Sequence, residues 1–185
     1  PNTAYVSINI DETTIRSNTL SIQNATATSF DPKADLLIAK PIEATQAEAK
    51  SLNMQFKRLV AIGKMTFKNL PADTIDAVTF TAPNKVLAGR SSFNYTTGQV
   101  VEYGYNSPMD NITINYAEAI AANNAAVFFT CLPCEVVAGE TFTVSAVCGD
   151  KTYTRTVTIK DRSLLFTEGD LTTFSVDMKD ATVED

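Results

Sequence analysis

The sequence predicts an all-β fold, an antiparallel β-sandwich with only short helical segments. Apolar and polar residues alternate with a period of two in a series of short runs. Turn-forming Gly, Pro, Asn and Asp residues separate these runs, and no long stretch has apolar residues at helical spacing. A chain of 185 residues, 44% of them hydrophobic, can bury one substantial core. We therefore expect a single β-sandwich domain over residues 1–185.

The predicted strands follow one another along the chain. The alternating runs are Leu52-Met54-Phe56, Val78-Phe80, Ile112-Ile114-Tyr116, Phe142-Val144-Ala146, Tyr153-Arg155-Val157-Ile159, Leu164-Phe166 and Phe174-Val176-Met178, and residues 126–130 form a further apolar strand. The turns between them are Asn69-Leu70-Pro71, Pro83-Asn84, Thr97-Gly98, Asn106-Ser107-Pro108, Gly139-Glu140, Gly149-Asp150 and Glu168-Gly169-Asp170. Residues 45–50 and 117–126 are the helix candidates, and both are too short to form a layer of helices.

One hairpin can be predicted in register. If Gly149-Asp150 is a two-residue turn, Phe142 lies opposite Val157 and Val144 lies opposite Arg155. The apolar residues of both strands then share one face, and a ladder of Thr and Ser side chains covers the other. A slip of one residue would mix the two sets, so the pattern specifies this register. Arg155 is the charged exception on the apolar side, and we interpret it as an edge-strand charge that discourages edge-to-edge pairing.

The composition disfavours an enzyme. The chain has no His, which removes Ser-His-Asp and Cys-His catalysis and His-ligated metals and haem. We expect no catalytic residues, no cofactor and no metal site. The formal charge of −6 argues against nucleic acid as a partner, because such binding depends on clustered Lys and Arg. The densest basic group, Lys57, Arg58, Lys64 and Lys68, is interpreted as the solvated face of a strand pair.

No run of 18 apolar residues exists, so the sequence predicts no membrane-spanning helix. The chain begins at Pro1 without a charged and then apolar leader, as expected after removal of an export signal or after trimming. Abundant Thr and sparse charge favour an extracytoplasmic β-protein.

The three cysteines are the first candidates for a redox or metal site. Cys131 and Cys134 have the C-x-x-C spacing of redox dithiols and of zinc half-sites. They follow an apolar strand, whereas redox dithiols usually open a helix, and a zinc site would need a fourth ligand beyond Cys148. We interpret them as ordinary strand cysteines, with one opportunistic disulfide left open.

The remaining candidate sites are weaker. The acidic residues have no motif for paired-acid catalysis and are interpreted as solvated: Asp110, Glu168, Asp170, Asp177, Asp180, Glu184 and Asp185. Three Asn-x-Thr sequences match the N-glycosylation pattern: Asn24-Ala25-Thr26, Asn94-Tyr95-Thr96 and Asn111-Ile112-Thr113. Asp73-Thr74-Ile75 resembles a short O-glycosylation motif of exported Bacteroidetes proteins. Tyr95, Tyr103 and Tyr105 are the aromatic cluster that could stack on a sugar.

Several blocks, in order over residues 20 to 180, resemble the fimbrillin-like surface proteins of Bacteroidetes, which include pilins and their lipoprotein relatives. Residues 29–39 (SFDPKADLLIA) resemble the segment that introduces the first long core strand, and residues 52–61 (LNMQFKRLVA) resemble the block after it. The other blocks resemble a turn, the next strand, the closing hairpin and the last strand: Asn69-Leu70-Pro71, Val78-Thr79-Phe80, and residues 137–144, 153–156, 165–169 and 174–178. Arg58 stands where relatives frequently have His, at a position that we expect to be structural.

The resemblance implies a transthyretin-like β-sandwich at the outer-membrane surface or in a fimbrium. The family's early strands, its G-D-x-I segment and its C-terminal domain are not in the sequence, so we expect one domain of a larger surface protein. The implied partners are other fimbrial or surface subunits, joined by strand addition to a sheet edge, with a host protein or glycan as a further ligand. The predicted function is therefore a non-enzymatic fimbrial or adhesion subunit, exported as a lipoprotein. The alternative is a glycan-binding β-sandwich module.

Overall fold

The computed structural model describes residues 7–8, 14–39, 42–43, 45, 51, 53–97, 99–104 and 107–185. Nearly all of the helix candidate at 45–50 lies outside these residues, as do Leu52, Gly98, Tyr105 and Asn106 of the predicted strands, turns and aromatic cluster. Within the described part of the chain, the only helix is a short 3₁₀ turn, η1 (Pro32–Ala34). No helix in these ranges is long and apolar enough to cross a membrane.

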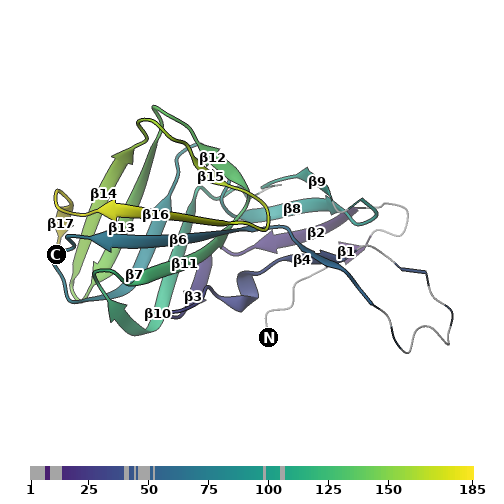
Figure 1. Ribbon diagram of the computed structural model, residues 1–185, viewed down its shortest axis with the longest axis horizontal. Coiled ribbons are helices and arrows are strands. Elements are labelled where there is room, and N and C mark those ends of the chain that lie inside the picture. The colour runs from purple at the N-terminus through teal and green to yellow at the C-terminus, as the bar shows by residue number, and fades with distance from the viewer. Residues whose placement is uncertain are drawn as a thin grey trace.

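The strands form two facing layers and an extension. The larger layer has the order β17 (Thr182–Glu184), β14 (Lys151–Thr158), β13 (Thr141–Cys148), β7 (Thr74–Thr81), β10 (Asn111–Ala121) and β3 (Ile22–Ala25). The facing layer has the order β11 (Ala126–Cys131), β6 (Ala61–Lys68) and β16 (Leu171–Asp177), and β12 (Cys134–Val136) pairs with β15 (Leu164–Phe166). Figure 1 shows β6 and β16 crossing in front of the larger sheet, so the fold is an all-β sandwich, as predicted.

The extension lies at the end of the long axis opposite the sandwich, on the right of Figure 1. A four-stranded sheet there has the order β1 (Ser7–Ile8), β2 (Thr14–Thr19), β8 (Gly89–Asn94) and β9 (Gln99–Glu102). Beside it, β4 (Leu37–Ala39) and β5 (Phe56–Arg58) form a separate two-stranded ribbon.

Phe80 of β7 lies at the centre of the core between the two layers. Its ring centroid is 5.3 Å from that of Phe129 on β11, 5.5 Å from Phe142 on β13, 5.8 Å from Phe166 on β15 and 5.9 Å from Phe174 on β16. Aromatic pairs at these spacings add favourable edge and offset contacts to the hydrophobic burial. One aromatic cluster therefore joins strands from both layers and from β15.

The predicted hairpin is confirmed in register. Phe142 lies opposite Val157 and Val144 opposite Arg155, and Gly149 takes the positive φ of 65° that the tight turn requires. The polar ladder is also present, with Thr143 bonded to Thr156 and Ser145 to Thr154, each at 2.9 Å between hydroxyl oxygens. Alternation of apolar and hydroxyl side chains is therefore sufficient to fix the pairing of these two strands.

The prediction of a helix at 117–126 is wrong. The segment contains the end of β10 and a bend before β11, and Ile120 pairs with Ile75 of β7 while Ala121 pairs with Thr74. Both isoleucines are buried, so burial against β7 overrides the local helix propensity of the alanines. The pairing between β10 and β7 shifts register between Asn115 and Ile120, which lets the strand continue through the alanine-rich stretch.

Three further expectations about strands need correction. The strand predicted from the alternation of Leu52, Met54 and Phe56 is displaced, because β5 begins only at Phe56, and the Phe56 side chain is 63% exposed. Residues 29–39 introduce the three-residue strand β4 and not a long core strand. The sandwich is not purely antiparallel, since β3 runs parallel to β10 and β16 runs parallel to β6.

Candidate assembly site

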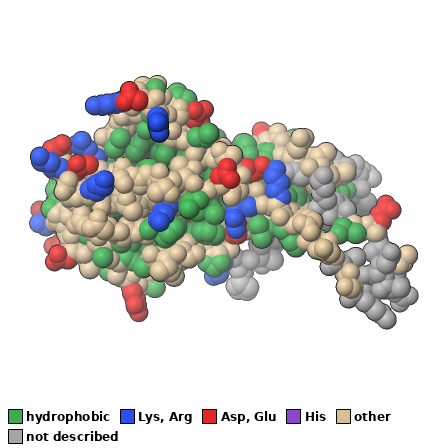
Figure 2. Space-filling view, in the orientation of Figure 1, with side chains coloured by type: hydrophobic (Ala, Val, Ile, Leu, Met, Phe, Trp, Pro, Cys, Tyr) green, Lys and Arg blue, Asp and Glu red, His purple; other side chains and the backbone are tan. Residues whose placement is uncertain are grey.

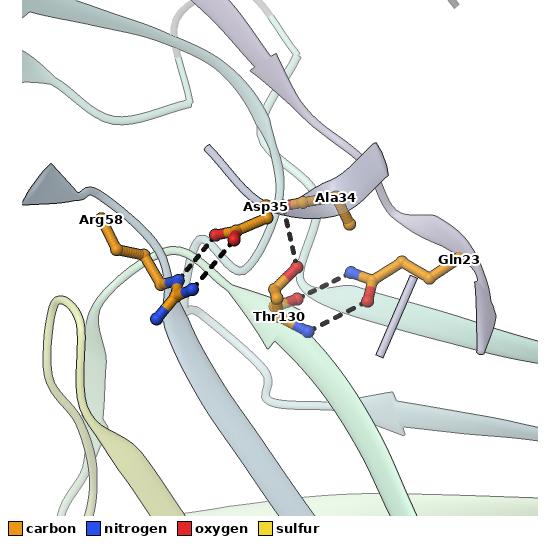
Figure 3. Close-up of polar contacts among 5 residues, drawn as sticks. All are labelled: Gln23, Ala34, Asp35, Arg58 and Thr130. Atoms are coloured by element: carbon orange, nitrogen blue, oxygen red, sulfur yellow. Dashed lines mark hydrogen bonds and ion pairs between the residues drawn. The ribbon is translucent and has the colours of Figure 1, made fainter. Parts of the chain in front are cut away.

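One side of the sandwich is closed by a glutamine. Gln23 on β3 donates from Nε2 to the Thr130 carbonyl of β11 at 2.7 Å, and its Oε1 accepts from the Thr130 amide at 3.0 Å (Figure 3). Both residues are fully buried. The side-chain amide thus offers Thr130 the donor and acceptor that a neighbouring strand would offer, and it joins the edge strands of the two layers.

The same corner fixes the β4–β5 ribbon. Thr130 donates its hydroxyl to the Ala34 carbonyl, and the next residue, Asp35, accepts from Arg58 Nε at 2.6 Å and from Arg58 Nη2 at 2.9 Å (Figure 3). The hydrogen bond to Asp35 raises the pKa of Arg58. This bidentate pair ties the end of β5 to the turn after η1, so Arg58 is structural, as expected.

The opposite side of the sandwich is open. Strand β16 pairs with β6 on one side, and no strand among the described residues pairs with its other side. Thr172 donates to the Leu165 carbonyl at 2.6 Å, which ties the start of β16 to β15. The outer edge at 173–177 therefore carries backbone groups without a ladder partner in the described part of the chain, which is the usual template for strand addition.

The larger layer also ends openly on this side. Strand β17 pairs only with residues 152–154 of β14, so no described strand covers the outer side of 155–158. Arg155 is the first residue of β14 beyond the part that pairs with β17. Its Nη1 donates to the Asp180 carbonyl at 3.0 Å. The interpretation of Arg155 as an edge-strand charge agrees with this position, although the short β17 lies beyond β14.

We call the strip between these two free edges, 173–177 of β16 and 155–158 of β14, the seam. Phe174, Val157 and Ile159 are half-buried apolar residues that pack against the core there. The Phe174 ring lies 5.8 Å from Phe142, and Phe142 pairs with Val157, so the seam is continuous with the aromatic cluster. It combines two free strand edges with an apolar floor, the two features that hold an added strand.

A second exposed apolar surface lies on the β4–β5 ribbon. Figure 2 shows hydrophobic side chains along this arm, on the right of the view. A hollow of about 360 Å³ is lined there by Ile38, Ile42, Asn53, Gln55, Phe56, Lys57 and Thr97. The alternation of Met54 and Phe56 predicts a strand there and does not reveal the hollow.

The basic group is divided among separate partners. Lys57 pairs with Glu168 at 2.6 Å, Arg58 pairs with Asp35, and Lys64 Nζ lies 5.7 Å from the centre of the Phe128 ring. Part of the basic group that was predicted to be solvated therefore holds neighbouring segments in place through ion pairs and a ring contact. This group forms no continuous cationic patch of the kind that binds phosphates.

The acidic candidates are also divided. Glu168 pairs with Lys57, Asp180 with Arg155, and Asp177 accepts from the Asn69 amide at 2.9 Å, which lowers the pKa of Asp177. Asp110 accepts from the Asn111 side chain, while Asp170, Glu184 and Asp185 are exposed. In the described ranges, no three Cys, Asp or Glu side chains gather into a group that could hold a metal ion.

The glycan-related candidates lie apart from one another. Thr74 is exposed at the start of β7 and directly follows a turn, and Asn24 is exposed on β3. The Asn94 side chain accepts from the amides of Thr96 and Thr97, and Asn111 is half-buried. Tyr95 and Tyr103 are half-buried, and burial raises the pKa of Tyr103 to about 12. Glycan attachment and glycan stacking stay predictions.

No disulfide joins the three cysteines in the structure. Cys131 is buried at the end of β11, and Cys134 is half-buried at the start of β12, three residues further along. Cys148 is half-buried at the end of β13. The apolar strand expected before Cys131 is confirmed as β11.

No family model matches the chain, and no curated protein matches it by sequence. A solved structure of a candidate cell adhesion protein from Bacteroides uniformis aligns with a TM-score of 0.53 at 13% identity, over 98% of this chain and 68% of that one. A candidate cell adhesion protein from Bacteroides ovatus aligns at 0.45 and 16% identity, over 80% of this chain and 58% of that one. A fimbrial protein from Bacteroides vulgatus aligns at 0.37 and 13% identity, over 77% and 58%.

The first of these alignments shows that the chain shares its fold with the candidate cell adhesion protein from Bacteroides uniformis. At these identities the likeness concerns the fold alone. It agrees with the fimbrillin-like resemblance and with the predicted all-β sandwich.

Proposed function

We propose that this protein is a non-enzymatic cell-surface subunit, fimbrial or adhesive, that assembles by receiving a β-strand of another surface subunit in the seam. The observation that carries the proposal is the contrast between the two sides of the sandwich. Gln23 closes one side with buried hydrogen bonds, whereas the seam leaves two strand edges free over a half-buried apolar floor. An outer-membrane location, a lipid anchor and a position within a larger surface protein belong to the same proposal.

The chemistry of the seam fits an added strand better than a small ligand. Main-chain groups on β16 would supply affinity, and the alternating side chains of the incoming strand would contact Phe174, Val157 and Ile159. The lack of His and the division of Lys57, Glu168, Arg155 and Asp180 into two separate ion pairs support a non-enzymatic role. Burying the apolar floor would contribute about 25 cal/mol for each Å² removed from water.

The experiment measures self-association of the whole chain by analytical ultracentrifugation over a wide concentration range. The test variant carries Leu171→Lys and Thr173→Lys, two exposed positions on β16. The control carries Ile22→Lys and Asn24→Lys, the equivalent exposed positions on β3, which also runs parallel to its only partner strand. Lysines on an edge strand discourage further pairing.

We expect the wild-type chain and the β3 variant to associate and the β16 variant to remain monomeric. Electron microscopy of the associated fraction should show linear assemblies. A wild-type chain that stays monomeric at all concentrations, or equal association of the two variants, would overturn the proposal.

A further inference from the structure

Two cysteine thiols are held together at a turn that the assembly proposal does not use. Cys131 ends β11 and Cys134 begins β12, with Leu132 and Pro133 between them. The turn is fixed on both sides, because the Leu132 amide donates to the Leu87 carbonyl at 2.8 Å and Cys134 pairs with Phe166 of β15. Cys131 is buried and Cys134 is half-buried, so the two thiols at the ends of this turn differ in their access to solvent.

The surroundings give the two thiols different roles. Burial raises the pKa of Cys131, so this thiol stays protonated and can donate a hydrogen bond. That hydrogen bond, with the nearby ammonium of Lys85, lowers the pKa of Cys134. Lys85 itself is held beside the turn by Glu140, at 2.7 Å between Nζ and Oε2. A half-buried thiol of lowered pKa next to a protonated thiol is the arrangement of an attacking and a resolving cysteine.

Cys148 is not part of this arrangement. It ends β13, whereas Glu140 directly precedes the first residue of that eight-residue strand. At about 3.3 Å per residue, Cys148 therefore lies roughly 25 Å along the strand from Glu140. Burial and the neighbouring Asp76 carboxylate raise its pKa. Cys148 thus serves as an internal comparison for the pair.

We propose that Cys131 and Cys134 are a thiol–disulfide exchange site, at which a small-molecule or protein disulfide converts the pair into a disulfide that closes the β11–β12 turn. The Cys134 thiolate attacks one sulfur of the incoming disulfide RSSR, forms a mixed disulfide and releases RS⁻. Cys131 then loses its proton to RS⁻ and attacks the Cys134 sulfur, which releases the second RS⁻. The chain loses two electrons and two protons, and RSSR becomes two RSH.

The inference is independent of the proposed strand addition, since the turn and the seam use different residues. It assigns the opportunistic disulfide, which the sequence leaves open, to this pair and not to Cys148. A zinc half-site is the competing reading of the C-x-x-C spacing, but no third ligand from Cys, Asp or Glu joins the two thiols in the part of the chain that the structure describes.

The experiment treats the folded full-length chain, carrying Cys148→Ser, with 5,5′-dithiobis(2-nitrobenzoate). We expect two equivalents of thionitrobenzoate to be released, and intact mass spectrometry should show a product lighter by two hydrogen atoms with no adduct. The variant carrying Cys131→Ala as well should release one equivalent and keep one adduct on Cys134, because the resolving thiol is absent. In the matched variant, Cys131 and Cys134 are both replaced and Cys148 is retained. The Cys148 thiol should also keep its adduct, and it should react more slowly than the Cys134 thiol.

Two results would overturn the inference: a stable adduct on Cys134 when Cys131 is present, or two cysteines that stay reduced in the folded chain. The melting temperature gives a second measurement that does not depend on the Cys131→Ala variant folding. Closing the turn should raise it by a few degrees, about 4 °C, because the disulfide restricts the unfolded chain. A lower melting temperature in the oxidised protein would show that the fold does not accommodate the bond.

Discussion

Gln23 shows how one side chain can decide which edges of a sandwich are available. A strand edge consists of an amide and a carbonyl that need partners, and Gln is the side chain that carries both groups on a flexible stem. Here it satisfies the amide and the carbonyl of Thr130 in a fully buried position. Because Gln23 already occupies the amide and the carbonyl of Thr130, this edge is less suited to an added strand, which supports the seam as the proposed assembly edge.

We expect Gln23→Leu to lower the free energy of unfolding by about 2–4 kcal/mol, because it leaves two buried backbone groups of Thr130 unpaired. Urea unfolding followed by circular dichroism measures the change. The control is Gln55→Leu on the exposed β4–β5 ribbon, where the side chain makes only a long contact of 3.5 Å to Asn53, and its effect should stay within about 0.5 kcal/mol. Equal effects of the two substitutions would contradict the role assigned to Gln23.

At the same scale, the sequence could not reveal Gln23 or Thr130. Their bonds join residues 107 positions apart, and a Gln between two exposed residues on a strand has no pattern of its own. The cysteine pair was visible as a spacing, but its location at a fixed turn beside Lys85 depends on tertiary structure. Local chemistry identifies candidate residues, whereas their partners come from the fold.

At the scale of the element, the hairpin of β13 and β14 could be predicted because its local signals agree at every position except Arg155. The turn has a glycine, one face alternates apolar residues, and the other face alternates hydroxyls. Strand β6 was predicted only through Lys64 and Lys68, as part of a strand pair without bounds, although its residues alternate between buried and half-buried up to Phe67. Its buried face includes Gly63, which lies opposite Phe129, and the phenyl ring fills the space where a Cβ would stand. Because Gly63 stands at a buried position where an apolar side chain would be expected, the alternation of apolar residues along β6 is interrupted in the sequence.

The hairpin makes a quantitative prediction about its two faces. Phe142→Ala removes a buried ring that contacts Phe80 and Phe174, so it should destabilise the fold by about 3–5 kcal/mol. Thr156→Ala removes one exposed hydroxyl bonded to Thr143 and should cost well under about 1 kcal/mol. Thermal unfolding of the two variants provides the measurement. A similar shift in melting temperature for both would mean that the two faces do not differ as described.

At the scale of the whole molecule, the two sides of the sandwich differ in how their edges end. On one side, β3 and β11 are joined by the buried Gln23 amide, and the ion pair of Arg58 and Asp35 holds the adjoining ribbon. On the other side, the chain passes from β16 of one layer to β17 of the other, and Arg155 holds Asp180 before β17 begins. The sequence predicted a sandwich with an open edge, but only the topology, with its two parallel pairs, determines which edge is open.

This asymmetry predicts where assembly should slow amide hydrogen exchange. In the monomer, the outward-facing amides of 173–177 and 155–158 have no ladder partner among the described strands and should exchange quickly. When subunits associate through the seam, those amides gain main-chain partners and should become protected, while residues 22–25 of β3 should exchange at the same rate as before. Exchange followed by mass spectrometry on monomeric and associated fractions measures both regions at once. Protection centred on β3, or on the apolar hollow of the β4–β5 ribbon, would place the contact elsewhere, because exchange reports which backbone groups gain partners whatever the identity of the incoming chain.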